Sequence, residues 1–291
     1  MATFVDTFYK AIDLNAAAKA QYGSTATAVQ TGQHLYNWAA QVNGQKQPLD
    51  LNQAVSTQYG TGYRPVHTGV HAYDWAAVRF TDLDLHVLPV LLIASDKFYD
   101  ITGVQTGISR LRSVVGYVQD WYRHHTGEGF RLLKPLAIST DYTAAQWDNL
   151  SDITANATNR YDLYNAAVAE YQKRLPTPGT NLRAVLVPYT GESVAKWKGA
   201  AGANPYAVAP QRASSVSCPT FSATGTLAAE CADAIYAVGH ELGHTWGLGH
   251  SCTAYPSASN CGQSLMEATK PPSAILLSQE ATALRATPFF T

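Results

Sequence analysis

Three of the nine histidines in this chain lie within eleven residues of one another. His240 and His244 are four positions apart and His250 follows six positions later, in the stretch GHELGHTWGLGHS. If this stretch begins as a helix, the first two imidazoles lie on one face, one turn apart, and can reach the same ion. Neutral imidazole binds zinc well, and three protein ligands leave one tetrahedral position for water. The spacing therefore predicts a catalytic centre with one zinc ion.

The residues between the histidines indicate how such a site would work. Gly247 follows His244 by three positions, and glycine takes positive φ at low cost, so the helix is expected to end there and the chain to return with His250. Glu241 is next to the first ligand and is expected to face the open side of the site. A carboxylate there can take a proton from zinc-bound water and give it to a leaving amine. This order of residues predicts hydrolysis of peptide bonds, with Glu241 as the catalytic base.

The complete pattern H-E-x-x-H-x-x-G-x-x-H is the signature of the metzincin metalloproteases, and HELGHTWGLGH matches every fixed position. Metzincins also carry a methionine turn beneath the three histidines, and Met266, in QSLMEA, follows His250 by sixteen residues. The sequence resembles a metzincin over about residues 82–291. The resemblance implies a secreted bacterial zinc endopeptidase that acts on protein or peptide substrates, with Gly247 and Met266 supporting the site.

The resemblance also implies a fold and a substrate pocket. The fold would be α+β, with a mixed twisted sheet, a backing helix, the active-site helix, the methionine turn and a C-terminal helix. The pocket beyond the scissile bond is normally walled by the methionine turn and the segment after it, which gives the candidates Ser264, Leu265, Glu267, Ala268 and Thr269. Ser251 is similar to the matrixin branch, whereas Ala268 stands where several metzincins have a tyrosine. We therefore expect three protein ligands and no tyrosine ligand.

All four cysteines lie within 44 residues around the histidine motif. An even, clustered set without a CxxC pair is typical of local disulfides in an oxidising compartment. Of the three pairings, we favour Cys218–Cys231 and Cys252–Cys261, because each closes a short loop rich in Ser, Thr, Pro and Gly. Reduced thiols, or Cys252 as a fourth zinc ligand, are the alternatives. The disulfides predict an extracellular protein whose signal peptide, absent from residues 1–10, has been removed.

Composition excludes several classes of partner. Charged residues make up 14% of the chain and the net charge is −1, which gives no electrostatic basis for binding nucleic acid. No apolar run approaches the roughly 20 residues of a membrane span. Calcium is a further candidate ion, but the aspartates concerned match no calcium loop and are treated as solvated charges: Asp82, Asp84, Asp96 and Asp100.

Residues 1–80 contain two tandem repeats of about 37 residues, at 12–40 and 49–77. The stretch TGQHLYNWAA recurs as TGVHAYDWAA, and the DLN and QYG motifs recur at the same offset. Each repeat is predicted to hold a short helix, capped by Asp13 or Asp50, and a strand of alternating aromatic residues.

The repeats resemble a short repeat of secreted bacterial proteins. Their aromatic residues either form the core of a small unit or present a surface for a carbohydrate or cell-surface ligand.

Residues 81–291 are expected to form one catalytic domain. Apolar runs and helical spacing predict the following elements: strands at 86–95, 130–138 and 182–189, and helices at 108–127 and over much of 144–173. Residues 190–225 are rich in Gly, Pro and Ser and are expected to be loop. The chain is expected to become helical again from Thr226 up to the histidine motif.

Two other functions fit the same residues. The first is a catalytically silent binding protein in which the repeats carry the function, although intact Glu241 favours activity. The second is a latent precursor in which the repeats block the cleft, with His34, His71, Asp13 or Asp50 reaching the metal. Cleavage activity of the whole chain distinguishes these hypotheses from an active peptidase.

Overall fold

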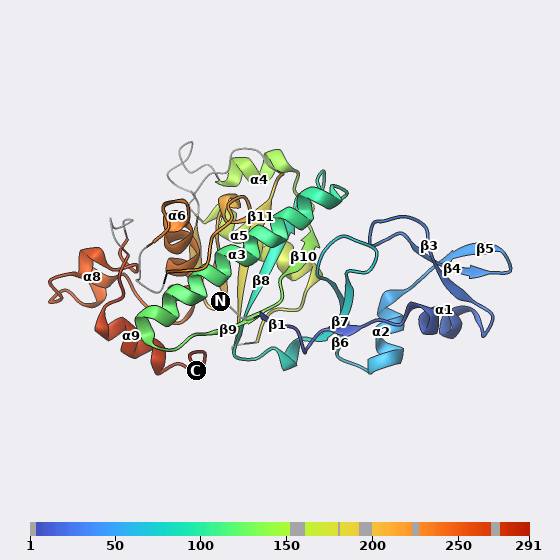
Figure 1. Cartoon of the computed structure of the whole chain (residues 1–291), viewed down its shortest axis with the longest axis horizontal. Coiled ribbons are helices and arrows are strands. Elements are labelled where there is room, and N and C mark those ends of the chain that lie inside the picture. The colour runs from blue at the N-terminus through green and yellow to red at the C-terminus, as the bar shows by residue number, and fades with distance from the viewer. Residues whose placement is uncertain (1–3, 152–160, 180, 192–199, 223–226, 269–273) are drawn as a thin grey trace.

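The architecture is α+β, with helices packed on both faces of a mixed sheet, which confirms the predicted fold class (Figure 1). The computed structural model describes residues 4–151, 161–179, 181–191, 200–222, 227–268 and 274–291. Within these residues the larger sheet has ten strands: β1 (Phe4–Val5), β2 (Lys10–Ala11), β6 (Tyr63–His67), β7 (Trp75–Arg79), β8 (His86–Ile93), β9 (Arg131–Leu133), β10 (Leu136–Ser139), β11 (Leu182–Tyr189), β12 (Ala201–Ala203) and β13 (Tyr206–Val208). A second sheet contains β3 (Thr27–Gln30), β4 (Trp38–Val42) and β5 (Gln45–Pro48).

The centre of the larger sheet is parallel and fully buried. β8 lies between β10 and β11, both parallel to it, and Leu88 is opposite Ala184. Every residue of β8 and β11 is buried, as expected for continuous apolar runs in a sheet that is covered on both faces. Side chains of β8 alternate between two cores, with Val87 and Leu91 in one and Leu88 and Leu92 in the other.

A long helix, α3 (Ile101–Thr126), covers the first core. It begins seven residues before the predicted start at 108, because the Asp100 carboxylate accepts the backbone N–H of Gly103 at 3.0 Å and caps the helix. Gly127 ends it in the left-handed conformation, as predicted. This is the helix against which the histidine motif packs.

Two further helices cover the other face of the sheet. α4 (Ala144–Ser151) and α5 (Asp162–Arg174) contribute the large buried side chains Trp147 and Tyr171 to the second core. Both lie in the stretch 144–173 that was predicted to be largely helical. Residues 152–160 of that prediction lie outside the described residues.

The two repeats at the N-terminus exchange their first strands. β5, which precedes the second repeat's helix, pairs with β4, the last strand of the first repeat, and Gln47 is opposite Ala40. β2, which precedes the first repeat's helix, pairs with β7 of the second, and Lys10 is opposite Ala77. These residue pairs are related by the same 37-residue offset, so the repeats form a closed, intertwined pair. Neither sheet is complete without the other repeat.

Reciprocal hydrogen bonds explain why the DLN and QYG motifs recur. The helices α1 (Leu14–Tyr22) and α2 (Leu51–Tyr59) are capped by Asp13 and Asp50, as predicted. The side-chain oxygen of Gln21 accepts the backbone N–H of Asp50 at 2.9 Å, and its NH2 group donates to the Asp50 carbonyl at 2.7 Å. Gln58 makes the same two bonds to Asp13, also at 2.9 and 2.7 Å. Each QYG motif therefore recognises the DLN motif of the other repeat.

The aromatic segments of the repeats are turns at their start, which corrects the predicted strands. His34 and His71 form an isolated bridge, and β4 and β7 begin only at Trp38 and Trp75. The Trp38 indole donates to the Ala72 carbonyl at 2.5 Å, and Trp75 makes the equivalent bond to Leu35 at 2.9 Å. The tryptophans thus hold the repeats together, which supports their role as core residues.

The second repeat is continuous with the rest of the protein. β6 pairs with β10, so β6, β7 and β2 extend the larger sheet, and β1 near the N-terminus pairs with β9. A short helical turn, η1 (Phe80–Asp82), joins the second repeat to β8 at the predicted junction. The repeats project from one end of the molecule (Figure 1).

Two stretches differ from the predicted elements. The strand expected at 130–138 is divided into β9 and β10 on either side of Lys134 and Pro135, because proline has no N–H to donate within a sheet. The loop expected at 190–225 contains β12, β13 and the short helix η2 (Gln211–Ser214). β12 and β13 carry no long apolar run, so their sequence gave little indication of strands.

Three of the four aspartates considered for calcium use their carboxylates in bonds to other parts of the protein. Asp82 forms an ion pair with Arg79 at 2.9 Å, Asp96 accepts the backbone N–H of Ala144 at 2.8 Å, and Asp100 caps α3. Asp84 makes its contact through its backbone carbonyl, which faces His86. Among the described helices, none is both long and apolar enough to cross a membrane.

Candidate metal centre

The helix that carries the first two histidines is made of short segments joined end to end. These are η3 (Ala229–Cys231), α6 (Ala232–Ala234), η4 (Ile235–Gly239) and α7 (His240–Thr245). η4 is a π-helical turn, a rare geometry that occurs mostly at functional sites. The hydroxyl of Tyr122, on α3, donates to the Gly239 carbonyl at 2.7 Å and fastens this turn to the core.

The side chains of the three histidines converge at the end of this helix. One ring nitrogen from each of His240, His244 and His250 lies within 4.8 Å of the others, and the Nε2 atoms of the first two are 3.0 Å apart. Nδ1 of His240 faces the Leu265 carbonyl at 2.7 Å, and Nδ1 of His244 faces the Leu248 carbonyl at 2.8 Å. Each Nδ1 must therefore donate, which leaves both Nε2 atoms free to bind a metal ion.

Burial keeps two of these imidazoles in the form that binds metal. It lowers the pKa of His240 to about 4 and also lowers the pKa of His244. Both rings are therefore neutral at physiological pH, as zinc ligands are. Among the described residues, this is the one group of three or more histidine, cysteine, aspartate or glutamate side chains that converges in this way. The residues present fit a metal ion.

Gly247 is the corner that brings the third histidine to the other two, as predicted. Its φ is +89°, and its N–H donates to the His244 carbonyl at 3.0 Å. The next N–H, from Leu248, donates to the Gly243 carbonyl at 3.1 Å, so the chain ends the helix and reverses. His250 then follows in an extended conformation and reaches the site.

Glu241 lies beside the ligands and is buried, with 8% of its surface exposed. Burial raises the pKa of its carboxyl to about 8. The strand β12 passes close to its backbone, because a Cβ added to Gly202 would lie 2.2 Å from the Glu241 carbonyl oxygen. Only glycine lets this strand approach the helix so closely. Sequence analysis missed this contact, since it assigned Gly202 to a loop.

Met266 is fully buried beneath the histidines, where the resemblance to metzincins placed it. A Cβ added to Gly243, on α7, would lie 2.3 Å from its sulfur atom. The backbone of Met266 accepts the N–H of Ser251 at 3.1 Å, which fastens the residue after the third histidine. Gly243 is therefore required for this packing, although spacing alone gave it no role.

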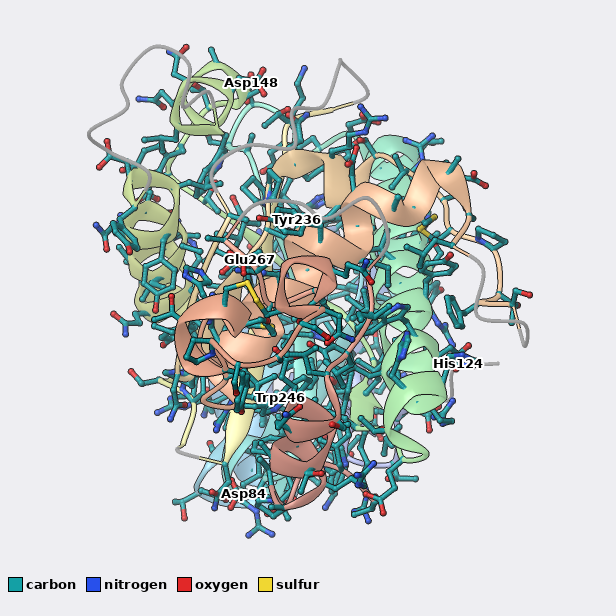
Figure 2. The ribbon with its side chains drawn as sticks, turned by 90° about the vertical axis from the view of Figure 1, so that its left-hand side faces the viewer. Asp84, His124, Asp148, Tyr236, Trp246 and Glu267 are labelled. Carbon is teal, nitrogen blue, oxygen red and sulfur yellow. A yellow bond between two sulfur atoms is a disulfide. The ribbon has the colours of Figure 1, made fainter. Side chains whose placement is uncertain are left out.

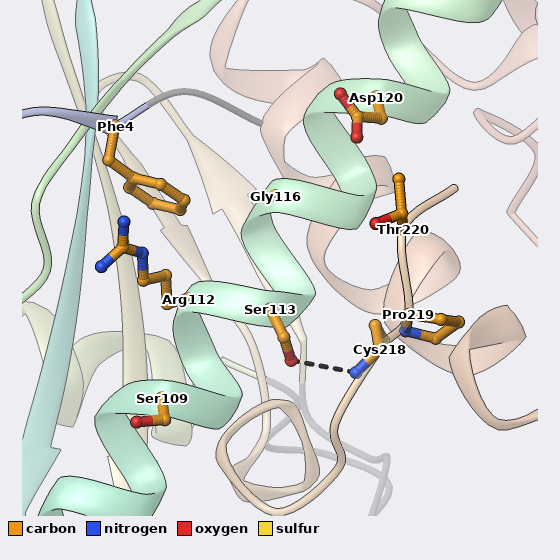
Figure 3. Close-up of a pocket in the computed structure, with 9 residues that line it drawn as sticks. All are labelled: Phe4, Ser109, Arg112, Ser113, Gly116, Asp120, Cys218, Pro219 and Thr220. Atoms are coloured by element: carbon orange, nitrogen blue, oxygen red, sulfur yellow. Dashed lines mark hydrogen bonds between the residues drawn. The ribbon is translucent and has the colours of Figure 1, made fainter. Parts of the chain in front are cut away.

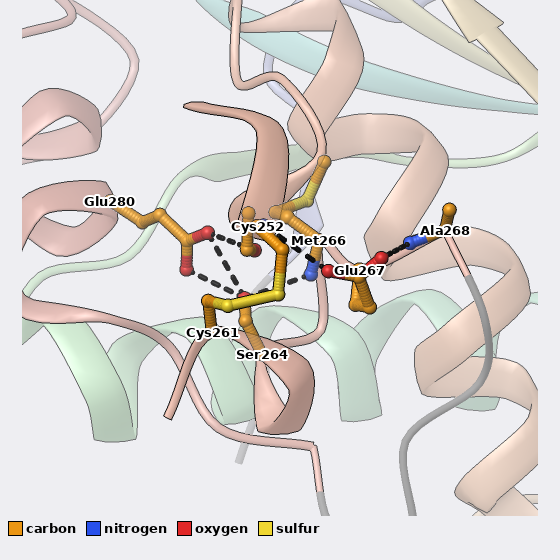
Figure 4. The surroundings of a disulfide bond; sticks show 8 residues. Cys252, Cys261, Ser264, Met266, Glu267, Ala268 and Glu280 are labelled. Atoms are coloured by element: carbon orange, nitrogen blue, oxygen red, sulfur yellow. Dashed lines mark hydrogen bonds between the residues drawn. A yellow bond between two sulfur atoms is a disulfide. The ribbon is translucent and has the colours of Figure 1, made fainter. Parts of the chain in front are cut away.

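A buried carboxylate that sequence analysis missed joins these parts. Glu280, on the C-terminal helix α9 (Ser278–Arg285), is completely buried. It accepts hydrogen bonds from the hydroxyl of Ser264 at 2.8 and 3.0 Å (Figure 4). It also accepts the hydroxyl of Ser251 at 2.5 Å and the N–H of Leu277 at 2.8 Å. It thus connects the segment after the third ligand to the methionine turn. Ser251, next to the third histidine, and Ser264, two residues before Met266, were the only sequence signal for such a partner.

The structure contains both favoured disulfides, Cys218–Cys231 and Cys252–Cys261, which confirms the predicted pairing. The second closes the loop around α8 (Ser251–Ala254) and η5 (Cys261–Gln263). Beside it, the Glu267 carboxylate accepts the backbone N–H groups of Cys252 at 3.2 Å and Ala268 at 2.8 Å (Figure 4). Because Cys252 is bonded to Cys261, it is not available as a fourth metal ligand.

The predicted pocket residues divide into two groups. Ser264 and Leu265 are fully buried, where the first bonds Glu280 and the carbonyl of the second accepts from His240. Glu267 is partly exposed and Ala268 is exposed. Thr269 lies outside the described residues.

Trp246, within the motif, packs in the core. Its ring lies 5.3 Å from that of Tyr122 and 5.0 Å from that of Phe290, between centroids. Arg183 donates to the carbonyl of the neighbouring Thr245 at 2.9 Å and stacks on Phe289. The end of the active-site helix is therefore anchored to β11 and to the C-terminus of the chain.

A groove runs along α3, away from the histidines. It has a volume of about 290 Å³ and is bordered by Phe4, Arg112 and the segment that begins at Cys218 (Figure 3). Ser113 accepts the Cys218 N–H there at 2.9 Å. None of the three histidines lines this groove.

Comparison with known proteins gives no assignment by similarity. The chain matches no described protein family, and no curated protein is significantly similar to it. The site must therefore be interpreted from its own residues.

Proposed function

We propose that the protein is a secreted zinc-dependent endopeptidase of the metzincin type. The observation that carries the proposal is the convergence of His240, His244 and His250 beside the buried carboxyl of Glu241. Met266, packed beneath the helix, and the left-handed Gly247 add the two structural features that the motif implies.

The residues divide the chemistry between them. The three imidazoles would each hold the ion through one nitrogen. A bound zinc ion would lower the pKa of water to about 7 and polarise a peptide carbonyl. Glu241, the buried carboxyl next to the first histidine, would take a proton from the water and return it to a leaving amine.

An edge strand beside Glu241 favours extended polypeptides as substrates. Among the described strands, β12 stands at one end of the larger sheet and runs antiparallel to β13. A free sheet edge offers a row of backbone donors and acceptors to which an extended peptide can add as a further strand. The close approach of Gly202 to Glu241 sets this edge against the proposed catalytic base. Unfolded segments of proteins fit such a site better than compact surfaces do.

The two disulfides support the extracellular location that we propose. They also stabilise the site, because one lies just before the active-site helix and the other just after the third histidine. A reducing compartment would open both loops.

The position of the repeats supports an active enzyme over a latent precursor. The repeats and the elements next to the histidine motif, α6 and α8, lie at opposite ends of the molecule (Figure 1). His34 and His71 pair with each other through their backbones in a β-bridge, and Asp13 and Asp50 cap helices within the repeats. Tyr36 and Tyr73 are exposed, which keeps a carbohydrate or cell-surface ligand of the repeats as a prediction.

Cleavage of casein by the purified chain tests the proposal. Glu241→Gln should reduce the rate by at least about 10²-fold, because it removes the catalytic base. Glu230→Gln, at an exposed glutamate on the same helical stretch, is the matched control and should be fully active. A chelator should abolish cleavage and added zinc should restore it. Equal cleavage by the wild type and Glu241→Gln would refute the proposal.

A further inference from the structure

A tyrosine packs against one of the three converging histidines. Tyr236 precedes His240 by one turn, on the π-helical segment η4. Its ring packs on the imidazole of His240 with centroids 5.1 Å apart. Its hydroxyl donates to the Ala268 carbonyl at 3.0 Å, and the side chain is partly exposed. Figure 2 shows Tyr236 and Glu267 on the same end of the molecule.

The partner of this hydroxyl makes it available to a ligand. Ala268 is exposed, so its carbonyl can bond water as readily as the phenol. A hydrogen bond at the surface contributes little net stability, whereas a donor next to developing charge in a buried site contributes much more. The bond to Ala268 can therefore be exchanged for a bond to substrate at small cost.

We propose that Tyr236 is a catalytic residue, which donates a hydrogen bond to the scissile carbonyl oxygen as that oxygen gains negative charge. The inference rests on the proposed peptidase function. The proton stays on the phenol throughout, so the residue acts as a donor and not as an acid. The sequence predicts no tyrosine ligand, because Ala268 stands where several metzincins have a tyrosine. Here a hydroxyl from the helix that carries His240 donates to the backbone of that same residue.

The main competing explanation is that Tyr236 only fastens the segment at Ala268 to the helix. A fastening role predicts lower thermal stability, weaker zinc binding or a higher KM when the hydroxyl is removed. A donor to the transition state predicts a lower kcat with KM unchanged. It also predicts weaker binding of a phosphinic peptide, whose tetrahedral anion resembles the transition state.

The experiment compares Tyr236→Phe with Tyr22→Phe in the full, zinc-loaded chain. Tyr22 is a matched control because its partly exposed hydroxyl also donates to a backbone carbonyl, that of Pro48 at 2.6 Å, but in the repeats. With a fluorogenic peptide, Tyr236→Phe should lower kcat about 10- to 100-fold with KM within about twofold. Tyr22→Phe should leave both constants unchanged. Phosphinic peptide affinity should fall by the same factor as kcat/KM, and zinc content should stay at wild-type level.

Three outcomes would overturn the proposal. They are an unchanged kcat, a loss confined to KM, and a loss of activity that is accompanied by loss of zinc or of thermal stability. The failure of the peptidase function itself is distinguishable, because the wild type would then cleave no faster than Glu241→Gln. If wild type is active and Tyr236→Phe equals it, only the role of Tyr236 fails.

Discussion

Glu280 and Ser264 are both fully buried, and the carboxylate of the first accepts the hydroxyl of the second at 2.8 and 3.0 Å. A buried carboxylate is costly unless several donors satisfy it, and here Ser251 and the Leu277 N–H complete the set. The C-terminal helix therefore fixes the methionine turn and the third histidine relative to each other. Preorganisation of a metal site requires this kind of support from outside the ligands.

Replacing Glu280 should loosen the site without touching a ligand. Glu280→Ala leaves two hydroxyls and an N–H without their buried acceptor, so we expect the free energy of unfolding to fall by about 2–4 kcal/mol. Zinc affinity should fall about 10- to 100-fold as well. Thermal unfolding with and without zinc measures both. Gln279→Ala, at the exposed neighbouring position, is the control, and equal behaviour of the two variants would contradict the assignment.

Gly243 and Gly249 differ sharply in the space around them. A Cβ at Gly243 would overlap the Met266 sulfur at 2.3 Å, whereas one at Gly249 meets only the Ala254 Cβ at 3.7 Å. Gly243→Ala should therefore displace the methionine turn, destabilise the fold by about 1–3 kcal/mol and weaken zinc binding. Gly249→Ala should be within about 0.5 kcal/mol of wild type. Chemical denaturation measures both, and the reverse order would show that the turn does not depend on this contact.

The reciprocal bonds between the repeats should make two distant glutamines equivalent. Gln21→Ala and Gln58→Ala each remove two hydrogen bonds to the backbone of the other repeat. The free energy of unfolding should therefore fall by about 1–2 kcal/mol in each variant. We expect similar losses of stability and similar sensitivity of the repeats to a protease. Gln53→Ala, at an exposed position on the second helix, is the control. If only one of the two glutamines mattered, the intertwined arrangement would be wrong.

The pairing of β6 with β10, at His67 and Ala137, should be sensitive to acid. Burial lowers the pKa of His67 to about 4; the backbone of Ala137 opposes this shift and nearby His34 adds to it. In the unfolded chain His67 titrates near 6.5, so the unfolded state binds more protons between pH 6.5 and 4. Stability should therefore fall as pH falls through this window, by at most about 3 kcal/mol from this residue.

His67→Gln tests this prediction, because glutamine does not titrate. The free energy of unfolding, measured by urea denaturation from pH 7 to pH 4, should fall less steeply in the variant than in the wild type. Parallel curves would mean that His67 is already protonated in the folded protein or is not buried.

The convergence of the three histidines could be predicted from the sequence because all three lie within eleven residues, where helix geometry and one glycine determine their positions. The two disulfides were predictable for the same reason, since each closes a short loop. Glu280 could not be predicted, because it is thirty residues from His250 and only tertiary packing brings it there. The same holds for Gly202, whose role depends on an edge strand without an apolar run.

The repeats show a similar limit. Their helices and caps followed from local motifs around Asp13 and Asp50. The exchange of β2 and β5 did not, because the choice of partner strand is not encoded in either repeat alone. The aromatic alternation at His34 predicted a strand but belongs to a turn, in which His34 is buried and Trp38 is partly buried, so burial does not follow the period of two.

Zinc binding by the intact, purified protein tests the central claim most directly. We predict one zinc ion per chain by elemental analysis, retained on dialysis, and less than a tenth of this in His240→Ala and His250→Ala. His124→Ala, at an exposed histidine on α3, should keep the full amount. Absence of zinc from the wild type after incubation with the ion, or equal zinc in all four proteins, would contradict the account.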